Sequence, residues 1–487
     1  MKILLAGHNL DYDIIRTLKD KSGTKQDLTP ETISAAYARI SRNPKPVNEL
    51  RAIAREEVDK ARQSNRKIVF DMGHNSVAEH AVFNIDVIGV SRFLVEEIEK
   101  FRLCSFTEKS QRYVLFDKDF VVPEEIRQAD LAGLFISTVE AQNDFYHEMY
   151  ENLRPYIFDK HKTLASDPAN RSMLEGWAKE DARYAISMAT ETQLGMTVNA
   201  RNLELMLRRL AALPLAEAQE YSEKLYAATK EIAPSLIRYT KATDYDKFTR
   251  RNLNRFSDAL IKKSQSKVKN AADVQLMSAS AAADNRAAAA LLFASSDANY
   301  AECLKTADKL TAQKKRSLFK TAFANLQIHD AVLREMETVD LQFELIASSS
   351  CFAQLKRHRM STIIAQEYNP HLGVTVPPSI KAIGRQKDFL DLMHRTQSTY
   401  EKIREKAPLA AVYVLTNAHR KRVLMKLNAR EMYHLARLRA DAHAQWDIHN
   451  LTGKMLKQAK KVMPLTLMMA CGKDHFPSLL NKTYSCT

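Results

Sequence analysis

Glycine is scarce in this chain, with 11 residues in 487, and neither GxGxxG nor GxxxxGK[ST] occurs. A Gly-rich phosphate loop is therefore excluded, and any phosphate must be held by side chains or helix N-termini. The five cysteines form no CxxC pair, which argues against a disulfide framework and a zinc knuckle. No apolar run reaches the roughly 18 residues of a membrane helix, so we expect no membrane span and a cytoplasmic location.

The composition that is present is that of a folded globular protein, with 45% hydrophobic and 27% charged residues. The length exceeds that of one ordinary core and predicts two domains, residues 1–250 and 251–487. The net charge of +15 suits polyanion binding, but its lysines are dispersed in helical segments such as 262–269. We interpret this charge as a solvated surface that favours small phosphorylated ligands, with nucleic acid as the alternative.

Two pairs of segments resemble each other along the chain. The first pair is GVSRFLVEEIEKFRLCSFTEKSQRYV from Gly89 and IASSSCFAQLKRHRMSTIIAQEY from Ile346. In each, a strand candidate (residues 81–87 and 341–346) precedes a short helix and a polar stretch. The second pair is NARNLELMLRRL from Asn199 and NAREMYHLARLR from Asn428. These matches predict a tandem duplication, with an insertion in the first copy within residues 117–175 and a seam near residues 245–300.

A first polar cluster, Gly73-His74-Asn75-Ser76 followed by Glu79-His80, resembles a metal site in residue type. Its spacing does not stack ligands on one helical face as HExxH does. We therefore interpret it as a ligand-contacting turn, and metal binding is the alternative.

A second cluster contains Ser105, Glu108, Ser110 and Arg112. If residues 108–112 are extended, alternate side chains place a carboxylate, a hydroxyl and a guanidinium on one side. Such a set can cradle a phosphate or sugar, since Arg binds bidentately while Ser donates. A polar loop with incidental charges is the alternative reading.

A third cluster is the run Arg357-His358-Arg359. Three consecutive potential cations are typical of an exposed helix end, and stacking against an acidic or aromatic ligand is the alternative.

Together these motifs resemble the flavin-dependent thymidylate synthases, whose hallmark is RHRxxSxxExSxR. The resemblance covers most of residues 30–220 and about 320–450. It implies an α+β fold of two tandem thymidylate synthase-like domains, each a mainly antiparallel sheet with long flanking helices. It also implies FAD as cofactor and conversion of dUMP to dTMP, with methylenetetrahydrofolate giving the carbon and NADPH the electrons. Because the family forms homotetramers, the resemblance implies a homodimer that makes a pseudo-tetramer.

The first copy retains the nucleotide cradle of that family. The resemblance implies dUMP contacts from Ser105, Glu108, Ser110, Arg112 and Arg183. It implies flavin contacts from His74, Ser76, Asn199 and Arg201. This copy departs from the family at Lys100, Phe101 and Leu210, where Arg, His and Arg are expected.

The second copy departs at the complementary positions. It retains dUMP contacts implied for Gln354, Arg357 and Arg439, and flavin contacts implied for Arg357, His358, Arg359, Asn428, Arg430, His434 and His443. Arg439 is expected to meet the pyrimidine carbonyl, and Arg439, Ser110 and His434 are the implied catalytic set. The cradle positions are instead Thr362, Ala365, Glu367, Asn369 and Val412.

Complementary losses predict one working composite site per chain, because a fused chain needs one cradle and one partner face. The opposite pairing would place Glu367 against a phosphate and should be inactive. The alternatives are a catalytically degenerate flavin- or nucleotide-binding paralogue with a regulatory or structural role, and a synthase for a different pyrimidine nucleotide.

Overall fold

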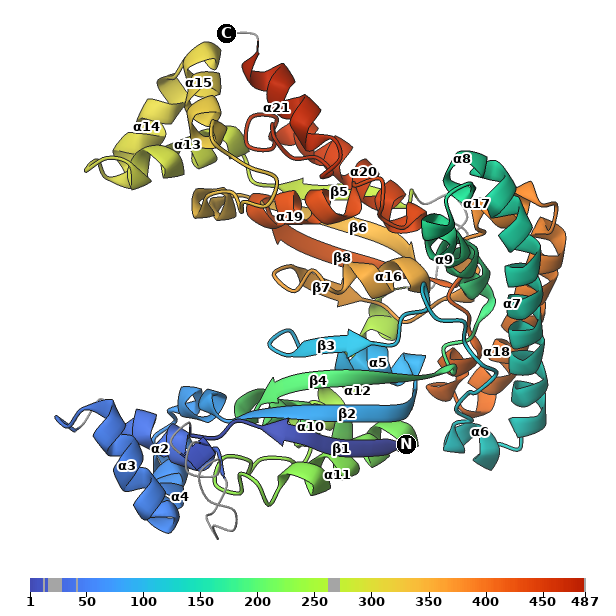
Figure 1. Ribbon diagram of the computed structural model, residues 1–487, viewed down its shortest axis with the longest axis horizontal. Coiled ribbons are helices and arrows are strands. Elements are labelled where there is room, and N and C mark those ends of the chain that lie inside the picture. The colour runs from blue at the N-terminus through green and yellow to red at the C-terminus, as the bar shows by residue number, and fades with distance from the viewer. Residues whose placement is uncertain (12–13, 16–28, 41–42, 262–271, 486–487) are drawn as a thin grey trace. The chain divides into compact units, whose positions relative to one another are not determined.

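The computed structural model describes residues 1–11, 14–15, 29–40, 43–261 and 272–485. They group into two compact units, Met1–Ser264 with Ile383–Leu415, and Gln265–Ala382 with Thr416–Thr487. Each unit contains one four-stranded antiparallel sheet flanked by helices, so the predicted α+β class is confirmed (Figure 1). Among the described residues, no helix combines the length and apolar character needed to cross a membrane.

The sheet of the first unit has the order β1-β2-β4-β3. Its strands are β1 (Lys2–His8), β2 (Val82–Ser91), β3 (Ser105–Glu108) and β4 (Glu191–Asn199). Burial alternates along β2 and β4, as expected for a sheet with one face on the core. The flanking helical segments are α2 (Glu31–Ile40), α3 (Val47–Glu56), α4 (Val58–Arg66), η1 (Lys67–Asp71), η2 (Asn75–His80), α5 (Arg92–Ile98), α6 (Glu124–Gln128), α7 (Ala132–Lys160), α8 (Lys162–Ala165), η3 (Pro168–Asn170), α9 (Arg171–Ala182), η4 (Arg183–Ala185), α10 (Ala200–Ala211), α11 (Ala216–Thr229) and α12 (Asp244–Leu260).

The sheet of the second unit repeats this order as β5-β6-β8-β7. Its strands are β5 (Val274–Ala279), β6 (Asp340–Ser348), β7 (Thr362–Ala365) and β8 (Arg420–Asn428). The Ala-rich segment near the expected seam forms α13 of this unit. Its helical segments are α13 (Ala283–Ala294), α14 (Tyr300–Lys309), α15 (Ala312–Phe323), η6 (Arg334–Thr338), α16 (Ser349–Leu355), η7 (Pro370–Leu372), α17 (Pro378–Ala382), α19 (Ala429–Arg439), α20 (Trp446–Val462) and α21 (Phe476–Tyr484).

The two sheets share their register as well as their strand order. Val82 faces Asn199 in the first sheet, and Asp340 faces Asn428 in the second. The next residue along, Phe83 in β2 and Leu341 in β6, is fully buried in each copy. The same apolar alternation therefore builds the same half-buried strand twice, and the predicted duplication is confirmed.

One irregularity distinguishes the copies. The pairing of β2 with β4 shifts between Ile88 and Val90, whereas β6 pairs with β8 without a shift. Gly89 lies at this bulge with φ +74°, a left-handed conformation that glycine adopts without strain. Strand β2 thus carries one extra residue, and it lies just before the helix that opens the cradle.

One segment of the second copy belongs to the first unit. Helix α18 (Gln386–Lys406) and the turn η8 (Ala410–Val414) pack beside α7 (Figure 1). Buried polar groups join them: the hydroxyls of Thr138 and Thr399 lie 2.9 Å apart, and the Gln142 amide donates to Thr396 and to the carbonyl of Val414 at 2.8 and 2.9 Å. The first copy carries the additional helix α9 before η4, within and just beyond the predicted insertion.

Candidate functional site

The cradle of the first copy begins with a buried ion pair between Arg92 and Glu108. Arg92 opens α5 directly after the N-cap Ser91, and Glu108 ends β3. One guanidinium nitrogen of Arg92 lies 2.9 and 3.1 Å from the two carboxylate oxygens of Glu108. The side chains are 4% and 8% exposed, so each ion depends on its partner for the solvation that burial removes.

A second ion pair joins the loop after β3 to α9. The Nε of Arg112 lies 2.5 Å from a carboxylate oxygen of Glu180, which is 7% exposed. The chain turns here, because the hydroxyl of Ser110 accepts from the backbone N–H of Arg112 at 3.2 Å. The expectation that residues 108–112 continue as an extended strand is therefore wrong. Strand β3 ends at Glu108, and the turn that follows brings Arg112 to Glu180.

Arg183 completes this group from η4, at the end of α9. Burial lowers the pKa of Arg183 from its ordinary value, and the charge of Glu180 opposes that shift. The charges of Arg112 and Arg92 lower this pKa further. We call Arg92, Glu108, Arg112, Glu180 and Arg183 the cradle network; its excess of one cation suits an anionic ligand.

Ser105 is not brought to this network. It lies three residues before Glu108 on β3, and an odd spacing on a strand directs side chains to opposite faces. The Ser105 side is exposed while the Glu108 side is half-buried.

The second unit holds a different network around His358. The Nδ1 of His358 lies 3.0 Å from a carboxylate oxygen of Glu431 on α19. The Nε–H of Arg439, at the end of α19, donates to the Nε2 of His358 at 3.2 Å. An Arg439 Nη2–H also donates to the carbonyl of Gln354 at 3.4 Å. We call Glu431, His358 and Arg439 the histidine relay.

Exposed cations lie beside this relay. Arg357 and Arg359 flank the buried His358 on the turn after α16, and both are exposed. His434 lies one turn along α19 from Glu431, is exposed, and packs edge-on against His358 with ring centroids 5.5 Å apart. The amide of Gln354 donates to Gln445 at 3.3 Å. The structure thus brings together the predicted residues Gln354, His358, His434 and Arg439.

The two Asn-Ala-Arg motifs have a local structural role in both copies. Asn199 and Asn428 are N-caps, and their side-chain oxygens accept from the backbone N–H three residues on at 2.9 and 2.8 Å. Arg201 pairs with Glu79, and Arg430 pairs with Glu337 at 2.9 Å. These contacts fix α10 and α19 against the preceding 3-10 turns.

The remaining predicted residues are exposed to solvent. His74 is the exposed N-cap of η2 and Ser76 lies within that turn, following Gly73 with φ +74°. His443 is 87% exposed, and its Nδ1 lies 2.9 Å from Asp441.

Comparison of the copies shows that each network is replaced as a whole in the other. Arg92, Glu108, Arg112, Glu180 and Arg183 correspond to Ser349, Ala365, Asn369, Leu409 and Val412. Glu431, His358 and Arg439 correspond to Asn202, Phe101 and Leu210. A buried charge without its partner is costly, so partners are expected to disappear together. Arg92, Glu180 and Glu431 received no role from the motif comparison; the contacts identify them, and their joint replacement in the other copy is the matching signal in the sequence.

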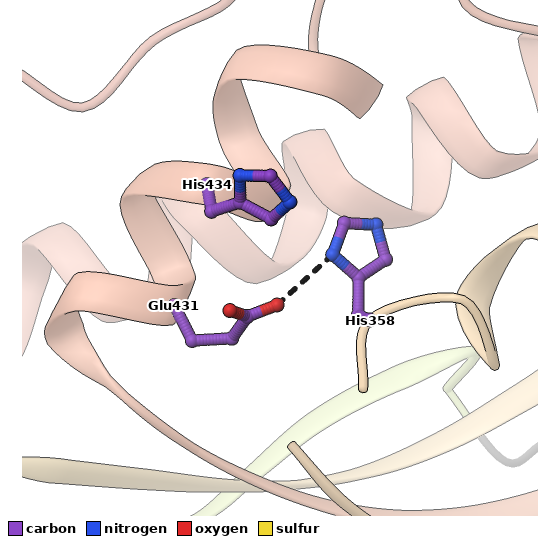
Figure 2. A group of neighbouring side chains, drawn as sticks. All are labelled: His358, Glu431 and His434. Atoms are coloured by element: carbon purple, nitrogen blue, oxygen red, sulfur yellow. Dashed lines mark hydrogen bonds and ion pairs between the residues drawn. The ribbon is translucent and has the colours of Figure 1, made fainter. Parts of the chain in front are cut away.

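One group of side chains among the described residues has metal-ligand spacing, namely His358, Glu431 and His434, whose ligand atoms lie within 4.8 Å of one another (Figure 2). The sequence cluster at His74 is not part of it. Arg439 occupies Nε2 of His358, and a guanidinium beside the site opposes a cation. The arrangement is better described as a hydrogen-bonded relay.

Known proteins match both copies. The family model described as thymidylate synthase complementing protein (Thy1) matches residues 25–235 and 261–465. A flavin-dependent thymidylate synthase from Clostridium tetani is 30% identical over 216 residues, 43% of this chain and 82% of the relative. A UPF0159 protein from Thermoplasma acidophilum is 22% identical over 485 residues, 88% of this chain and 93% of the relative. A crystal structure of the Helicobacter pylori flavin-dependent thymidylate synthase with FAD and dUMP aligns with TM-score 0.32 and 15% identity, over 50% of this chain and 100% of that chain.

The family model alone spans most of the chain, and the matched ranges contain strands β2, β3 and β4 of the first sheet and all four strands of the second. The chain therefore belongs to the Thy1 family of flavin-dependent thymidylate synthases, as a tandem fusion of two diverged copies.

Proposed function

We propose that this chain is an FAD-dependent thymidylate synthase that converts dUMP to dTMP through one composite site per chain. Methylenetetrahydrofolate would supply the carbon and NADPH the electrons. The observation that carries the proposal is that the cradle network survives only in the first copy and the histidine relay only in the second.

Energetics explains only part of this pattern. Loss of one buried ion favours loss of its partner, so each network is expected to vanish as a unit. That coupling does not require each network to survive once, in opposite copies. Selection for a single site that uses both networks accounts for the reciprocity.

The cradle network suits the nucleotide phosphate. Arg112 is 26% exposed and its charge acts on the buried Arg183, so a phosphate at Arg112 would be attracted by both guanidinium charges. Ser110 lies at the same turn. We assign the phosphate to Ser110, Arg112 and Arg183, joined by Arg357, and the pyrimidine carbonyl to Arg439.

The second copy fits a flavin through its donor chemistry. Arg357 and Arg359 present two exposed cations for a pyrophosphate, and His434 presents an exposed imidazole. A bound flavin would supply the hydride chemistry, while the chain binds and orients. Asn428 and Arg430 would act on the flavin indirectly, because their contacts hold α19 in place. Asn199 and Arg201 hold α10 in the same way. His74, Ser76 and His443 remain proposed flavin contacts.

We also propose that the copies meet at residues 250 and 251, and that two chains form a homodimer equivalent to the family tetramer. Sedimentation of the purified chain tests the oligomeric state, and a mass of one chain would contradict it.

The test of function is dUMP-dependent oxidation of NADPH by the purified flavin-loaded protein with methylenetetrahydrofolate present. Arg439→Ala should abolish this activity. Arg209→Ala is the matched control, because Arg209 is an exposed residue in the last turn of α10 in the other copy. Unchanged turnover in Arg439→Ala would refute the assignment.

A degenerate binding protein is the second candidate function. It is favoured by the fact that the relative matched over nearly its whole length carries only the name UPF0159 protein. A flavin spectrum that dUMP perturbs, without turnover under any reductant, would support this candidate over the synthase.

A further inference from the structure

Glu431 lies where no motif assigned a role, yet its carboxylate lies 3.0 Å from Nδ1 of His358. Its side chain extends from α19 toward the turn that carries His358, and Figure 2 shows the two side chains pointing toward each other. Both are buried, with 1% of the His358 side chain and 7% of the Glu431 side chain exposed. The pair therefore forms where water cannot supply either hydrogen bond.

The tautomer of His358 follows from its two partners. Arg439 can only donate, so the Nε2 of His358 must carry a lone pair to accept from it. The proton of a neutral imidazole then lies on Nδ1, which faces the Glu431 carboxylate. Both contacts agree on one tautomer.

The charge of His358 is consistent with this assignment. Burial lowers the pKa of His358 from its ordinary value, and the Glu431 hydrogen bond acts in the opposite direction. Arg439 and His434 lower this pKa, and the Glu431 charge raises it. Because burial and the Arg439 guanidinium both lower this pKa, His358 is neutral at neutral pH and can accept from Arg439.

A metal ion bound to His358 is not compatible with these hydrogen bonds. A cation on Nδ1 would place the proton of His358 on Nε2, against the Nε–H of Arg439 at 3.2 Å. Two donors would then face each other, and the guanidinium would repel the ion.

The corresponding position in the first copy shows what happens without the relay. There Phe101 replaces the histidine and Leu210 the arginine, and Asn202 replaces Glu431. The Asn202 amide instead donates to the N-cap Asn199 at 2.8 Å. Of the two copies, only the one with the histidine and the arginine has a carboxylate at this position.

We propose that Glu431 is a positioning residue that holds His358 as the Nδ1–H tautomer, so that Nε2 orients the Arg439 guanidinium for the pyrimidine of dUMP. The role of Glu431 rests on the proposed function only in its last step. Its first step, the tautomer, concerns the chain alone.

The first experiment measures dUMP affinity of the flavin-loaded protein by calorimetry in a double-mutant cycle. Glu431→Ala should weaken dUMP binding about tenfold, while Glu431→Gln, whose amide oxygen still accepts from Nδ1–H, should retain most of it. Glu431→Ala combined with Arg439→Ala should bind no worse than Arg439→Ala alone. Additive losses, or equal losses in the Ala and Gln variants, would overturn the proposal.

The second experiment reads the imidazole directly by nitrogen NMR of the histidines, with His358→Asn for assignment. The proposal requires Nδ1 protonated and Nε2 unprotonated, with this preference weakened in Glu431→Ala. The opposite tautomer in the unsubstituted chain would overturn it, as would stoichiometric Zn²⁺ binding lost in His434→Ala. If the chain binds no dUMP but shows this tautomer, the proposed function fails while the positioning of Arg439 stands.

Discussion

Arg92 and Glu108 form an ion pair at 2.9 Å with both side chains almost fully buried, and the second copy has Ser349 and Ala365 at the same places. Removing one partner leaves a buried charge, so Arg92→Ser or Glu108→Ala alone should cost about 3–5 kcal/mol of unfolding free energy. The double variant, which reproduces the second copy, should cost less than either single change. Urea denaturation measures this, and a double variant that is the least stable of the three would contradict the coupling.

Arg112 should matter more for nucleotide binding than its counterpart in the second copy. It is the most exposed member of the cradle network, and a charge-assisted hydrogen bond is worth about 1.5–3 kcal/mol. Arg112→Ala should therefore weaken dUMP binding about ten- to hundredfold by calorimetry. Asn369→Ala is the matched control and should leave the affinity unchanged; equal effects would contradict a single cradle.

Tyr413 holds η8, a turn from the second copy's sequence, in the first unit. Its hydroxyl donates to Glu217 at 2.6 Å, and Glu217 also accepts from the backbone N–H and the hydroxyl of Ser91, both at 2.7 Å. Burial raises the pKa of Glu217, and the Tyr413 hydrogen bond opposes that rise. Tyr413→Phe should lower the unfolding free energy by about 1–3 kcal/mol.

Thermal denaturation checks this value, with Tyr245→Phe on the exposed α12 as the control. An unchanged midpoint for Tyr413→Phe would show that the hydrogen bond contributes nothing net.

His419 should make the second unit sensitive to acid. Burial lowers its pKa to about 4, from 6.5, and its Nδ1 accepts from the Thr416 N–H at 2.9 Å. As the pH falls, His419 takes up a proton in the unfolded chain before it does so in the folded chain. The free energy of unfolding therefore keeps its full value above pH 6.5 and decreases as the pH approaches 4. The shift corresponds to about 3 kcal/mol at the acid end of that range.

Urea denaturation between these pH values measures the effect. His419→Asn, whose side-chain oxygen can still accept from Thr416, should flatten the pH dependence, whereas the exposed His394→Gln should not. An identical slope in His419→Asn would contradict this origin of acid sensitivity.

Local signals in the sequence were sufficient for much of the fold. The alternation that buries Phe83 and Leu341 predicted the central strands, and the Asn199 and Asn428 caps mark where α10 and α19 begin. These features depend on neighbours within a few residues, so a single chain segment contains the information.

The partners of buried charges required the tertiary structure. Glu180 meets Arg112 from α9, far along the chain, and the turn at Ser110 redirects a segment that reads as extended. Likewise, α18 carries the second copy's sequence but packs in the first unit.

The sequence by itself therefore determined the family, the duplication and the complementary departures of the two copies. Only the tertiary structure decided that Arg92, Glu180 and Glu431 belong to the networks, because an ion pair joins residues distant in sequence. Its energy depends on burial and on distances of a few ångströms, which no motif records.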